Sequence, residues 1–396
     1  MIRHLFTLMW NRRRANALLT LEILLAFVVL FAVSSIGVFY WTNYRAPLGF
    51  AYENAWQIGL SPGTQPRAEQ FGTLQQVLAR LRSTPGVVAV SRSQDNTPFA
   101  FSNNTTNLDY GEGPAKRSAG DINIYSAGPE LRDVMGVELH AGRWFDRRDE
   151  ASTLPPVVID ERLRAQLFEP GQEAVGQVVR SGSERWRVVG VSGPYRADGE
   201  LSEPKPSLFR YVGPQDTTRA LFRLLVRVRP GAGAALEKRI IDDIRTINPL
   251  WHSSVDYLTE MRIAQLKVRL TPPAILGVVC VFLIVNVMLG LFGVLWLNIS
   301  QRRAELGVRR ALGATGAAIS GQVLGEILVL TTFGLVLGLL VAAQFPLLGV
   351  FNVKAGVYLT AMGLAAAGLY LLAAGCALYP SQLAAGIQPA VALREE

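Results

Sequence analysis

Four long apolar runs dominate the hydrophobic pattern of this chain. They cover residues 17–41, 274–297, 321–348 and 355–379. A bilayer core about 30 Å thick is crossed by about 20 helical residues, so each run is long enough for one transmembrane helix. The first run is too long for the apolar region of a signal peptide and ends in Phe39-Tyr40-Trp41 instead of small residues. We therefore expect it to stay attached as an anchor.

Arginines set the expected orientation of these helices. A cluster of three lies directly before the first run, and four more lie between the second and third runs: Arg12, Arg13, Arg14, Arg302, Arg303, Arg309 and Arg310. Short loops rich in Lys and Arg face the cytosol. Both termini should therefore be cytosolic in an inner (cytoplasmic) membrane, with residues 42–271 in the periplasm.

This topology divides the chain into consecutive parts. We predict a cytosolic amphipathic N-terminal helix (1–16), a first span (17–41), a periplasmic domain with a stalk (42–271), a second span (272–299), a cytosolic loop or helix (300–318), a third span (319–348), a short external loop (349–354), a fourth span (355–379) and a cytosolic tail (380–396). The N-terminal helix rests on helical spacing of apolar residues, and the alternative is a basic start that only sets topology.

Between the first two spans, short apolar segments alternate in character. Helical spacing covers 71–82 and 234–247, and strand patterns cover 86–91, 157–160, 177–180, 185–191 and 221–229. The mixture predicts an α/β or α+β domain in a polytopic α-helical membrane protein. Residues 94–118 are rich in Asn, Thr, Gly and Pro, which predicts a long loop. Residues 258–270 read as a helical stalk, with a kink expected at Pro272-Pro273.

Charge and cysteine content narrow the function classes. The net charge is +8, but the basic residues form no stripe interleaved with aromatics, and no helix-turn-helix or zinc-finger spacing occurs. Nucleic acid is therefore not an expected partner. The two cysteines, Cys280 and Cys376, both lie in spans, so the periplasmic domain has no thiol for a disulfide.

The loop at 301–315 is the main candidate site because it is dense in charge and glycine between two spans. Its helix-forming residues predict a stiff element. Seven side chains are candidates for docking onto a cytosolic partner: Arg303, Glu305, Leu306, Val308, Arg309, Arg310 and Leu312. The apolar members would fill a groove and the charged ones would fix orientation. The alternative is that the arginines only set topology and bind anionic lipids, which does not explain an acid at Glu305.

Polar and small residues inside the spans form a second group. Glu326 lies about seven residues into the third run, roughly 10 Å deep at 1.5 Å per residue, and needs a partner or water. Snorkelling to the interface is the alternative. Asn286 and Glu22 carry weaker versions of this expectation, and Gly334 and Gly338 have small-xxx-small spacing that allows close helix packing.

Enzyme chemistry finds no support in the sequence. The three histidines are far apart, no Cys or His pair has metal-ligand spacing, and no Gly-x-Ser-x-Gly nucleophile elbow occurs. We expect no catalytic, metal or cofactor site. No Gly-x-x-x-x-Gly-Lys-Ser/Thr phosphate loop occurs either, so the chain is not expected to hydrolyse ATP.

Several motifs resemble the MacB/FtsX-type permeases of ABC systems, also called type VII ABC proteins. In the periplasmic part these are residues 135–137, 141–145, 157–161 with 167–168, 175–177 and 186–191. In the membrane part they are the loop at 303–313, residues 322–326, and the ending formed by Pro380, Ala384, Pro389 and residues 392–394. The resemblance covers nearly the whole chain.

The resemblance implies a permease with a MacB-like periplasmic domain and an FtsX-like membrane domain. Two such chains, identical or homologous, pair on cytosolic ABC ATPase subunits, which bind the ATP, and a periplasmic adaptor or outer-membrane component is a further partner. ATP-driven motion is transmitted to the periplasm (mechanotransmission) for efflux or export of a drug, peptide or lipoprotein-like substrate. The resemblance also implies that Glu326 ties the third span to the cytosolic arginines. The alternative function is a membrane sensor or regulatory subunit that controls an envelope enzyme without transport.

Overall fold

The chain folds into two compact units, which we describe separately. The computed structural model describes residues 13–101, 103–213, 216 and 222–385. One unit, the membrane unit, combines the chain up to Thr42 with the chain from Leu270 onward, and the other, the extracytoplasmic unit, spans Asn43–Arg269. The predicted N-terminal helix at 1–16 lies mostly outside the described residues, as does the end of the tail from 386.

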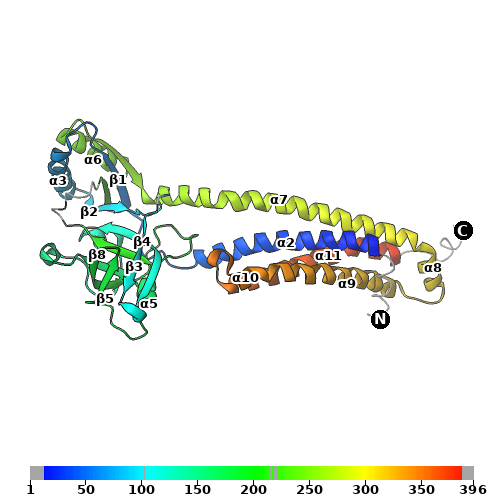
Figure 1. Ribbon diagram of the computed structural model, residues 1–396. Helices are drawn as coiled ribbons and strands as arrows, with labels where there is room; N and C mark the ends of the chain where they lie inside the picture. Colours follow the sequence, from blue (N-terminus) through cyan, green and yellow to red (C-terminus); the bar gives the residue numbers. More distant parts are fainter. Residues whose placement is uncertain (1–12, 102, 214–215, 217–221, 386–396) are drawn as a thin grey trace. The chain divides into compact units, whose positions relative to one another are not determined.

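Among the residues that the structure describes, four long apolar helices build the membrane unit (Figure 1). They are α2 (Arg13–Tyr44), α7 (Leu258–Gln301), α9 (Gly316–Ala342) and α11 (Ala355–Ala385). All four are long and apolar enough to cross a membrane. Their shared core includes Phe27, Phe31, Leu335, Tyr358 and Leu369, so α2, α9 and α11 pack through one apolar cluster. The fold class of four transmembrane helices around an inserted α/β domain is thereby confirmed.

Helix ends differ from the sequence prediction at two places. Helix α9 ends at Ala342, and a short helix, α10 (Gln344–Leu348), follows where the sequence predicts a continuous third span to 348. Helix α11 continues through Pro380 to Ala385, beyond the predicted end at 379. A proline lacks the backbone N–H that an interior helical position uses. The composition of a span therefore predicts its existence better than its last residue.

The described part of the extracytoplasmic unit is built on one sheet of eleven strands. They are β1 (Ala55–Ser61), β2 (Val87–Asp95), β3 (Thr105–Tyr110), β4 (Arg117–Ala127), β5 (Leu139–Gly142), β6 (Pro156–Asp160), β7 (Val178–Ser181), β8 (Glu184–Ser192), β9 (Ser207–Tyr211), β10 (Arg223–Val228) and β11 (His252–Tyr257). The strand order is β11-β1-β10-β2-β4-β3-β7-β8-β6-β9, and β5 pairs with β8. Because β9 also pairs with β4, strands β4, β3, β7, β8, β6 and β9 close into a ring.

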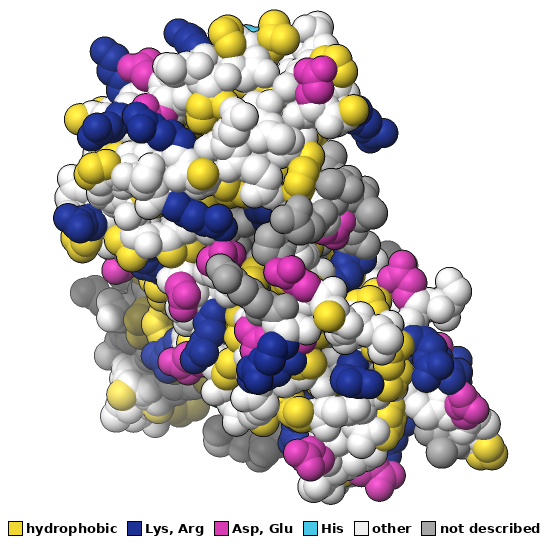
Figure 2. All heavy atoms as spheres, turned by 90° about the vertical axis from the view of Figure 1, so that its left-hand side faces the viewer, with side chains coloured by type: hydrophobic (Ala, Val, Ile, Leu, Met, Phe, Trp, Pro, Cys, Tyr) yellow, Lys and Arg dark blue, Asp and Glu magenta, His cyan; other side chains and the backbone are white. Residues whose placement is uncertain are grey.

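Two lobes follow from this topology. The sheet lobe contains β11, β1, β10 and β2 with helices α3 (Arg67–Ser83) and α6 (Ala234–Ile247), which share an apolar core with these strands. The barrel lobe is the closed ring, with helix α5 (Glu161–Leu167) against it, whereas helix α4 (Leu131–Met135) contacts β2 and β10. Ring closure removes the free edges on which foreign strands pair. Figure 2 shows acidic and basic side chains interspersed on the visible face of this unit, without a field of one sign.

The predicted loop at 94–118 is wrong in its middle. Strand β3 lies inside it and pairs with β4. The polar composition is explained by side-chain bonding: Asn96 donates to the carbonyl of Asn104 (2.7 Å) and accepts from its N–H (2.5 Å). Such amides replace ladder bonds where the chain changes direction. Asn and Thr therefore occupy the turn around the strand as well as loops.

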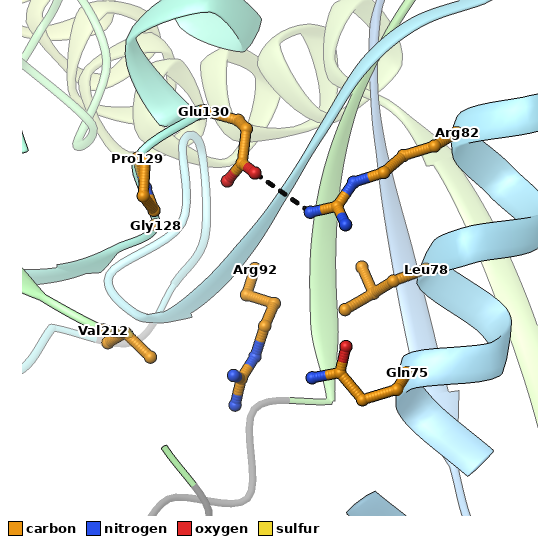
Figure 3. Close-up of a pocket in the computed structure, with 8 residues that line it drawn as sticks. All are labelled: Gln75, Leu78, Arg82, Arg92, Gly128, Pro129, Glu130 and Val212. Atoms are coloured by element: carbon orange, nitrogen blue, oxygen red, sulfur yellow. Dashed lines mark hydrogen bonds and ion pairs between the residues drawn. The ribbon is translucent and has the colours of Figure 1, made fainter. Parts of the chain in front are cut away.

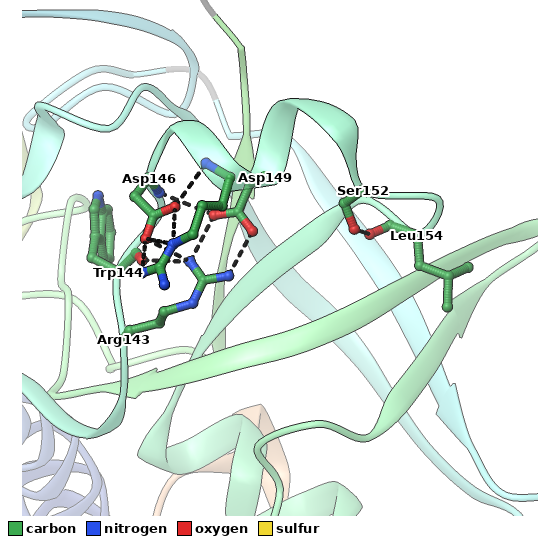
Figure 4. A network of polar contacts seen from close by, with 7 residues as sticks. Arg143, Trp144, Asp146, Asp149, Ser152 and Leu154 are labelled. Carbon is green, nitrogen blue, oxygen red and sulfur yellow. Dashed lines mark hydrogen bonds and ion pairs between the residues drawn. The ribbon is translucent and has the colours of Figure 1, made fainter.

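The Gly142-Arg143-Trp144-Phe145 motif builds a compact polar network (Figure 4). Arg143 donates two hydrogen bonds of 2.7 Å to the two oxygens of Asp149. Gly142 has φ +70°, and a Cβ there would lie 2.4 Å from the carbonyl oxygen of Val189, so only glycine fits. The indole of Trp144 packs edge-on against Phe209, with ring centroids 5.1 Å apart. The motif is thus structural and holds β5 against β8.

Candidate coupling site

The predicted docking loop contains a separate short helix, α8 (Arg303–Ala311), between α7 and α9. Gly313 has φ +97°, a left-handed conformation that glycine adopts without strain, and it ends the turn after α8. Thr315 then caps α9 by accepting a hydrogen bond from the N–H of Ala318 (3.3 Å). Helix formers followed by glycine and threonine therefore produce a helix, a tight turn and a second helix.

A chain of polar contacts links α8 to α9. Arg302 lies at the start of α8 and pairs with Glu326 (3.1 Å). Gln322, one turn before Glu326, donates to the same carboxylate (3.1 Å) and accepts from Arg309 (2.7 Å). Arg309 also pairs with Glu305 one turn earlier in α8 (2.6 Å). We call these five residues the coupling network.

Burial makes the inner half of the coupling network the stronger half. The side chains of Arg302 and Glu326 are 18% and 28% exposed, whereas those of Arg309 and Glu305 are 39% and 52% exposed. Glu326 follows Gly316, the first residue of α9, by ten residues or roughly 15 Å along the helix. A carboxylate at such a position needs a cation, and Arg302 supplies it.

The apolar residues of α8 face in two directions. Leu306 is 6% exposed and packs against Ile319 of α9, so the expectation that it fills a partner's groove is wrong. It belongs to the protein's own core because it lies on the face of α8 turned toward α9. Val308 and Leu312 are 43% and 83% exposed and remain available. The side chains of Arg303 and Arg310 lie outside the described part.

The two other polar residues of the spans occupy different surroundings. Asn286 is exposed and donates a hydrogen bond to the carbonyl of Phe282 on its own helix (2.8 Å), which satisfies half of its amide. Glu22 of α2 is half-buried and lies over Gly290 of α7. A Cβ at Gly290 would lie 2.4 Å from the Glu22 Oε1 atom, so the carboxylate uses the space that glycine leaves.

The paired glycines of α9 lie where α2 crosses it. A Cβ added at Gly334 would be 2.5 Å from Ile23, and one added at Gly338 would be 2.4 Å from the ring of Phe27. Both distances are far below van der Waals contact. The absence of side chains therefore lets α2 and α9 approach closely.

Cavities in the extracytoplasmic unit differ in size. One of about 340 Å³ lies beside β5 and is lined by residues that include Gly142, Arg164 and Glu173. Another of about 30 Å³ lies between α3 and the segment before α4, and the Arg82–Glu130 ion pair (3.0 Å) crosses its rim (Figure 3). Its volume accommodates one or two water molecules. In the described ranges, no three His, Cys, Asp or Glu side chains gather in a way that could hold a metal ion.

The sequence singled out the segment that forms α8 as a candidate site, but it did not predict all of the polar contacts there. Arg302 was not among the seven predicted docking residues, and Gln322 entered only as part of a family motif. The available signal was spacing: Gln322 and Glu326 are four residues apart, which puts two polar side chains on one face of an otherwise apolar helix. Their partners depend on the turn at Gly313, whose path the sequence does not give.

Comparison with known proteins assigns most of the chain to two family models. Residues 17–243 match the family model of the MacB-like periplasmic core domain, and residues 277–389 match that of the FtsX-like permease C-terminal domain. The chain is similar to "Macrolide export ATP-binding/permease protein MacB 1/2" of Paracoccus denitrificans (strain Pd 1222), at 30% identity over 57% of this chain and 34% of the relative. It is similar to "Macrolide export ATP-binding/permease protein MacB" of Hahella chejuensis (strain KCTC 2396), at 27% identity over 70% of this chain and 43% of the relative.

The chain thus spans less than half the length of these curated relatives. Among solved structures it resembles the periplasmic region of MacB from Actinobacillus actinomycetemcomitans, with 15% identity, a TM-score of 0.38, and coverage of 54% of this chain and 92% of that one. The two family models together match most of the chain, one on the inserted domain and one on the last three spans. The chain belongs to the MacB/FtsX-type permeases and is a multi-pass permease subunit of an ABC transporter.

Proposed function

We propose that this chain couples ATP hydrolysis by a separate cytosolic ABC ATPase to conformational change in its extracytoplasmic unit, and that this motion drives efflux or export. Both termini and α8 lie on the cytosolic side in this proposal, and two permease chains, identical or homologous, form the working complex. The observation that carries it is the coupling network, which gives α8 a built connection to α9. A helix that served only topology would not need it.

The physical argument is one of load transfer. An ATPase that grips α8 moves it as a unit, because a short helix is stiff along its axis. Leu306 packs against Ile319, and Glu326 holds Arg302, so displacement of α8 passes into α9. Arg302 directly follows the last residue of α7, so the same displacement reaches α7.

The exposed end of α8 defines the docking surface. Leu312, which follows the last residue of α8, is 83% exposed, and Val308 is 43% exposed. Glu305 and Arg309 lie in α8 with Val308. Large exposed apolar side chains next to charges are typical of a protein contact and are costly in water. We assign docking to Leu312 and Val308, with Glu305 and Arg309 fixing orientation. The transported substrate is a drug, peptide or lipoprotein-like molecule by analogy with the relatives alone.

Affinity purification of the tagged chain from membranes in mild detergent tests this proposal. We expect an ABC ATPase to co-purify with the parent chain and to be lost from Leu312→Glu. The matched control is Leu250→Glu, which places the same charge at a half-exposed leucine (48%) of the extracytoplasmic unit and should retain the ATPase. Equal recovery from parent and Leu312→Glu would reject α8 as the docking element. Absence of any ATPase from the parent would favour the sensor or regulatory function.

A further inference from the structure

Two charged side chains of the extracytoplasmic unit are deeply buried. Arg196 and Glu200 are 5% and 4% exposed, and both belong to the segment between β8 and β9. Burying an ion costs several kcal/mol unless it is paired and hydrogen-bonded. The contacts of these two residues explain how their buried charges are stabilised.

Arg196 fastens this segment to the beginning of the extracytoplasmic unit. Its Nη1 atom donates to the carbonyls of Asn43 (2.9 Å) and Ala46 (2.8 Å). Its Nη2 atom donates to the carbonyls of Glu200 (2.9 Å) and Ser202 (2.7 Å). Asn43 belongs to the last turn of α2, where carbonyls have no helical partner and favour a cation.

Arg262 fastens the same segment to the first turns of α7. It pairs with the Glu200 carboxylate, its Nε at 2.8 Å and its Nη2 at 2.5 Å from Oε1. Its guanidinium also lies 5.1 Å from the ring centre of Tyr52, which adds a cation–π contact. One turn further on, Gln265 lies so close to Gly199 that a Cβ there would be 2.3 Å from its Oε1. Glycine at 199 is favoured by its φ of +81°, which side chains with a Cβ rarely adopt.

Glu200 therefore accepts hydrogen bonds from both arginines. Its backbone carbonyl accepts from Arg196, and its side chain accepts from Arg262. We propose that Arg196, Glu200 and Arg262 form a joint that locks the first residues of the extracytoplasmic unit to the first turns of α7. The three act as positioning residues. Displacement of residues 43–48 is transmitted through Glu200 to the first turns of α7, and displacement of these turns is transmitted back in the same way.

The consequence for transport rests on the proposed function, because only then does ATP-driven motion enter these segments. The joint itself does not rest on it and can be tested on the purified chain without any ATPase. Its distinctive property is that a change at Arg262 should weaken hydrogen bonds made by another residue, Arg196. Arg262 pairs with Glu200, lies over Tyr52 and has an electrostatic interaction with Tyr44, whereas the side-chain hydrogen bonds to the carbonyls of Asn43 and Ala46 come from Arg196.

Hydrogen exchange of the full-length chain in detergent, read by mass spectrometry, provides the test. Two amides report on the far side of the joint: the N–H of Ala46, bonded to the Asn43 carbonyl (3.1 Å), and the N–H of Arg196, bonded to the Leu48 carbonyl (2.9 Å). Arg262→Met leaves a buried carboxylate without its cation. We expect peptides containing these amides to exchange roughly tenfold faster, since local opening sets the rate.

The controls separate coupling from general damage. Arg180→Met removes the cation of an exposed pair with Glu112 in the barrel lobe and should leave both amides unchanged. If Arg262→Met accelerates exchange throughout the unit, Glu200→Gln replaces it, because it keeps the backbone carbonyl and a side-chain acceptor while removing the charge. Acceleration confined to residues 198–202 and 258–266 in the variant used would overturn the joint, whether or not an ATPase binds α8.

Discussion

Asp160 gives the sharpest quantitative prediction in the extracytoplasmic unit. It ends β6, is 1% exposed, and caps α5 by accepting from the N–H of Leu163 (2.9 Å). Burial is the main cause that raises its pKa from 3.8 to about 6, against the lowering effects of its hydrogen bonds and of Arg162 and together with the adjacent Glu161.

The sign and size of the effect follow from linkage. Between pH 3.8 and about 6 the folded state keeps a proton that the unfolded state has lost. The free energy of unfolding therefore falls as the pH rises through this range and is level above it. Each tenfold change in proton affinity corresponds to about 1.4 kcal/mol, so the charged carboxylate destabilises the fold by about 3 kcal/mol at neutral pH.

Asp160→Asn removes this pH dependence while keeping an oxygen that can cap α5, since Asn and Asp are equivalent at that position. The assay is urea unfolding of the full-length chain in detergent between pH 4.5 and 7.5. It is followed by the fluorescence of the buried Trp144 and Trp186. We expect the stability difference, variant minus parent, to grow by about 2 kcal/mol between pH 4.5 and 7.5, because part of the full effect lies below pH 4.5. Parallel profiles for the two proteins would refute the assignment of a proton to Asp160.

Two further predictions concern packing and a buried ion pair. Gly338→Ala brings a Cβ within 2.4 Å of Phe27 and should destabilise the chain by about 1–3 kcal/mol. The control Gly325→Ala, on the same helix, meets nothing within 4 Å and should be neutral or stabilising by up to about 1 kcal/mol. Thermal unfolding in detergent compares the two variants, and equal effects would exclude close packing of α2 on α9. Arg143→Met should cost about 1–3 kcal/mol because Asp149 is buried. Burial raises the pKa of Asp149, but hydrogen bonds from Arg143 and from a backbone N–H outweigh burial and lower the pKa overall. The difference in urea midpoint between variant and parent should therefore shrink below pH 3.8. A constant difference would show that the charge pair is not the cause.

The sequence predicted those parts of the fold that depend on composition and period. Apolar runs gave the four spans, and α6 (Ala234–Ile247) has the predicted bounds because its apolar residues repeat at helical spacing and Pro230-Gly231 stops the preceding strand. Strand β3 was missed because Asn and Thr side chains stabilise its flanking turn. The ring of the barrel lobe was not predictable either, since the β4–β9 pairing joins strands about eighty residues apart and local pattern carries no such information.

The candidate site shows the same division. Charge density located α8, but the roles of its side chains depend on the turn at Gly313. That turn places Leu306 against Ile319 and Arg309 against Gln322. The joint at Glu200 could not be predicted from the sequence, because Arg and Glu side chains in a loop are ordinarily solvated. No local pattern shows that residues 43–48 and the start of α7 both contact the segment at 196–202.

Hydrogen exchange of the reconstituted complex with its ATPase, measured with and without ATP, tests the central claim most directly. In the parent chain we expect ATP to change exchange in residues 258–267, at the start of α7. Arg302→Met should still bind the ATPase, because Leu312 is untouched, but should lose the ATP-dependent change, since Glu326 no longer holds the start of α8. A parent complex that hydrolyses ATP with no change at 258–267 would contradict transmission through this chain. An Arg302→Met complex with an unaltered response would contradict the coupling network as its route.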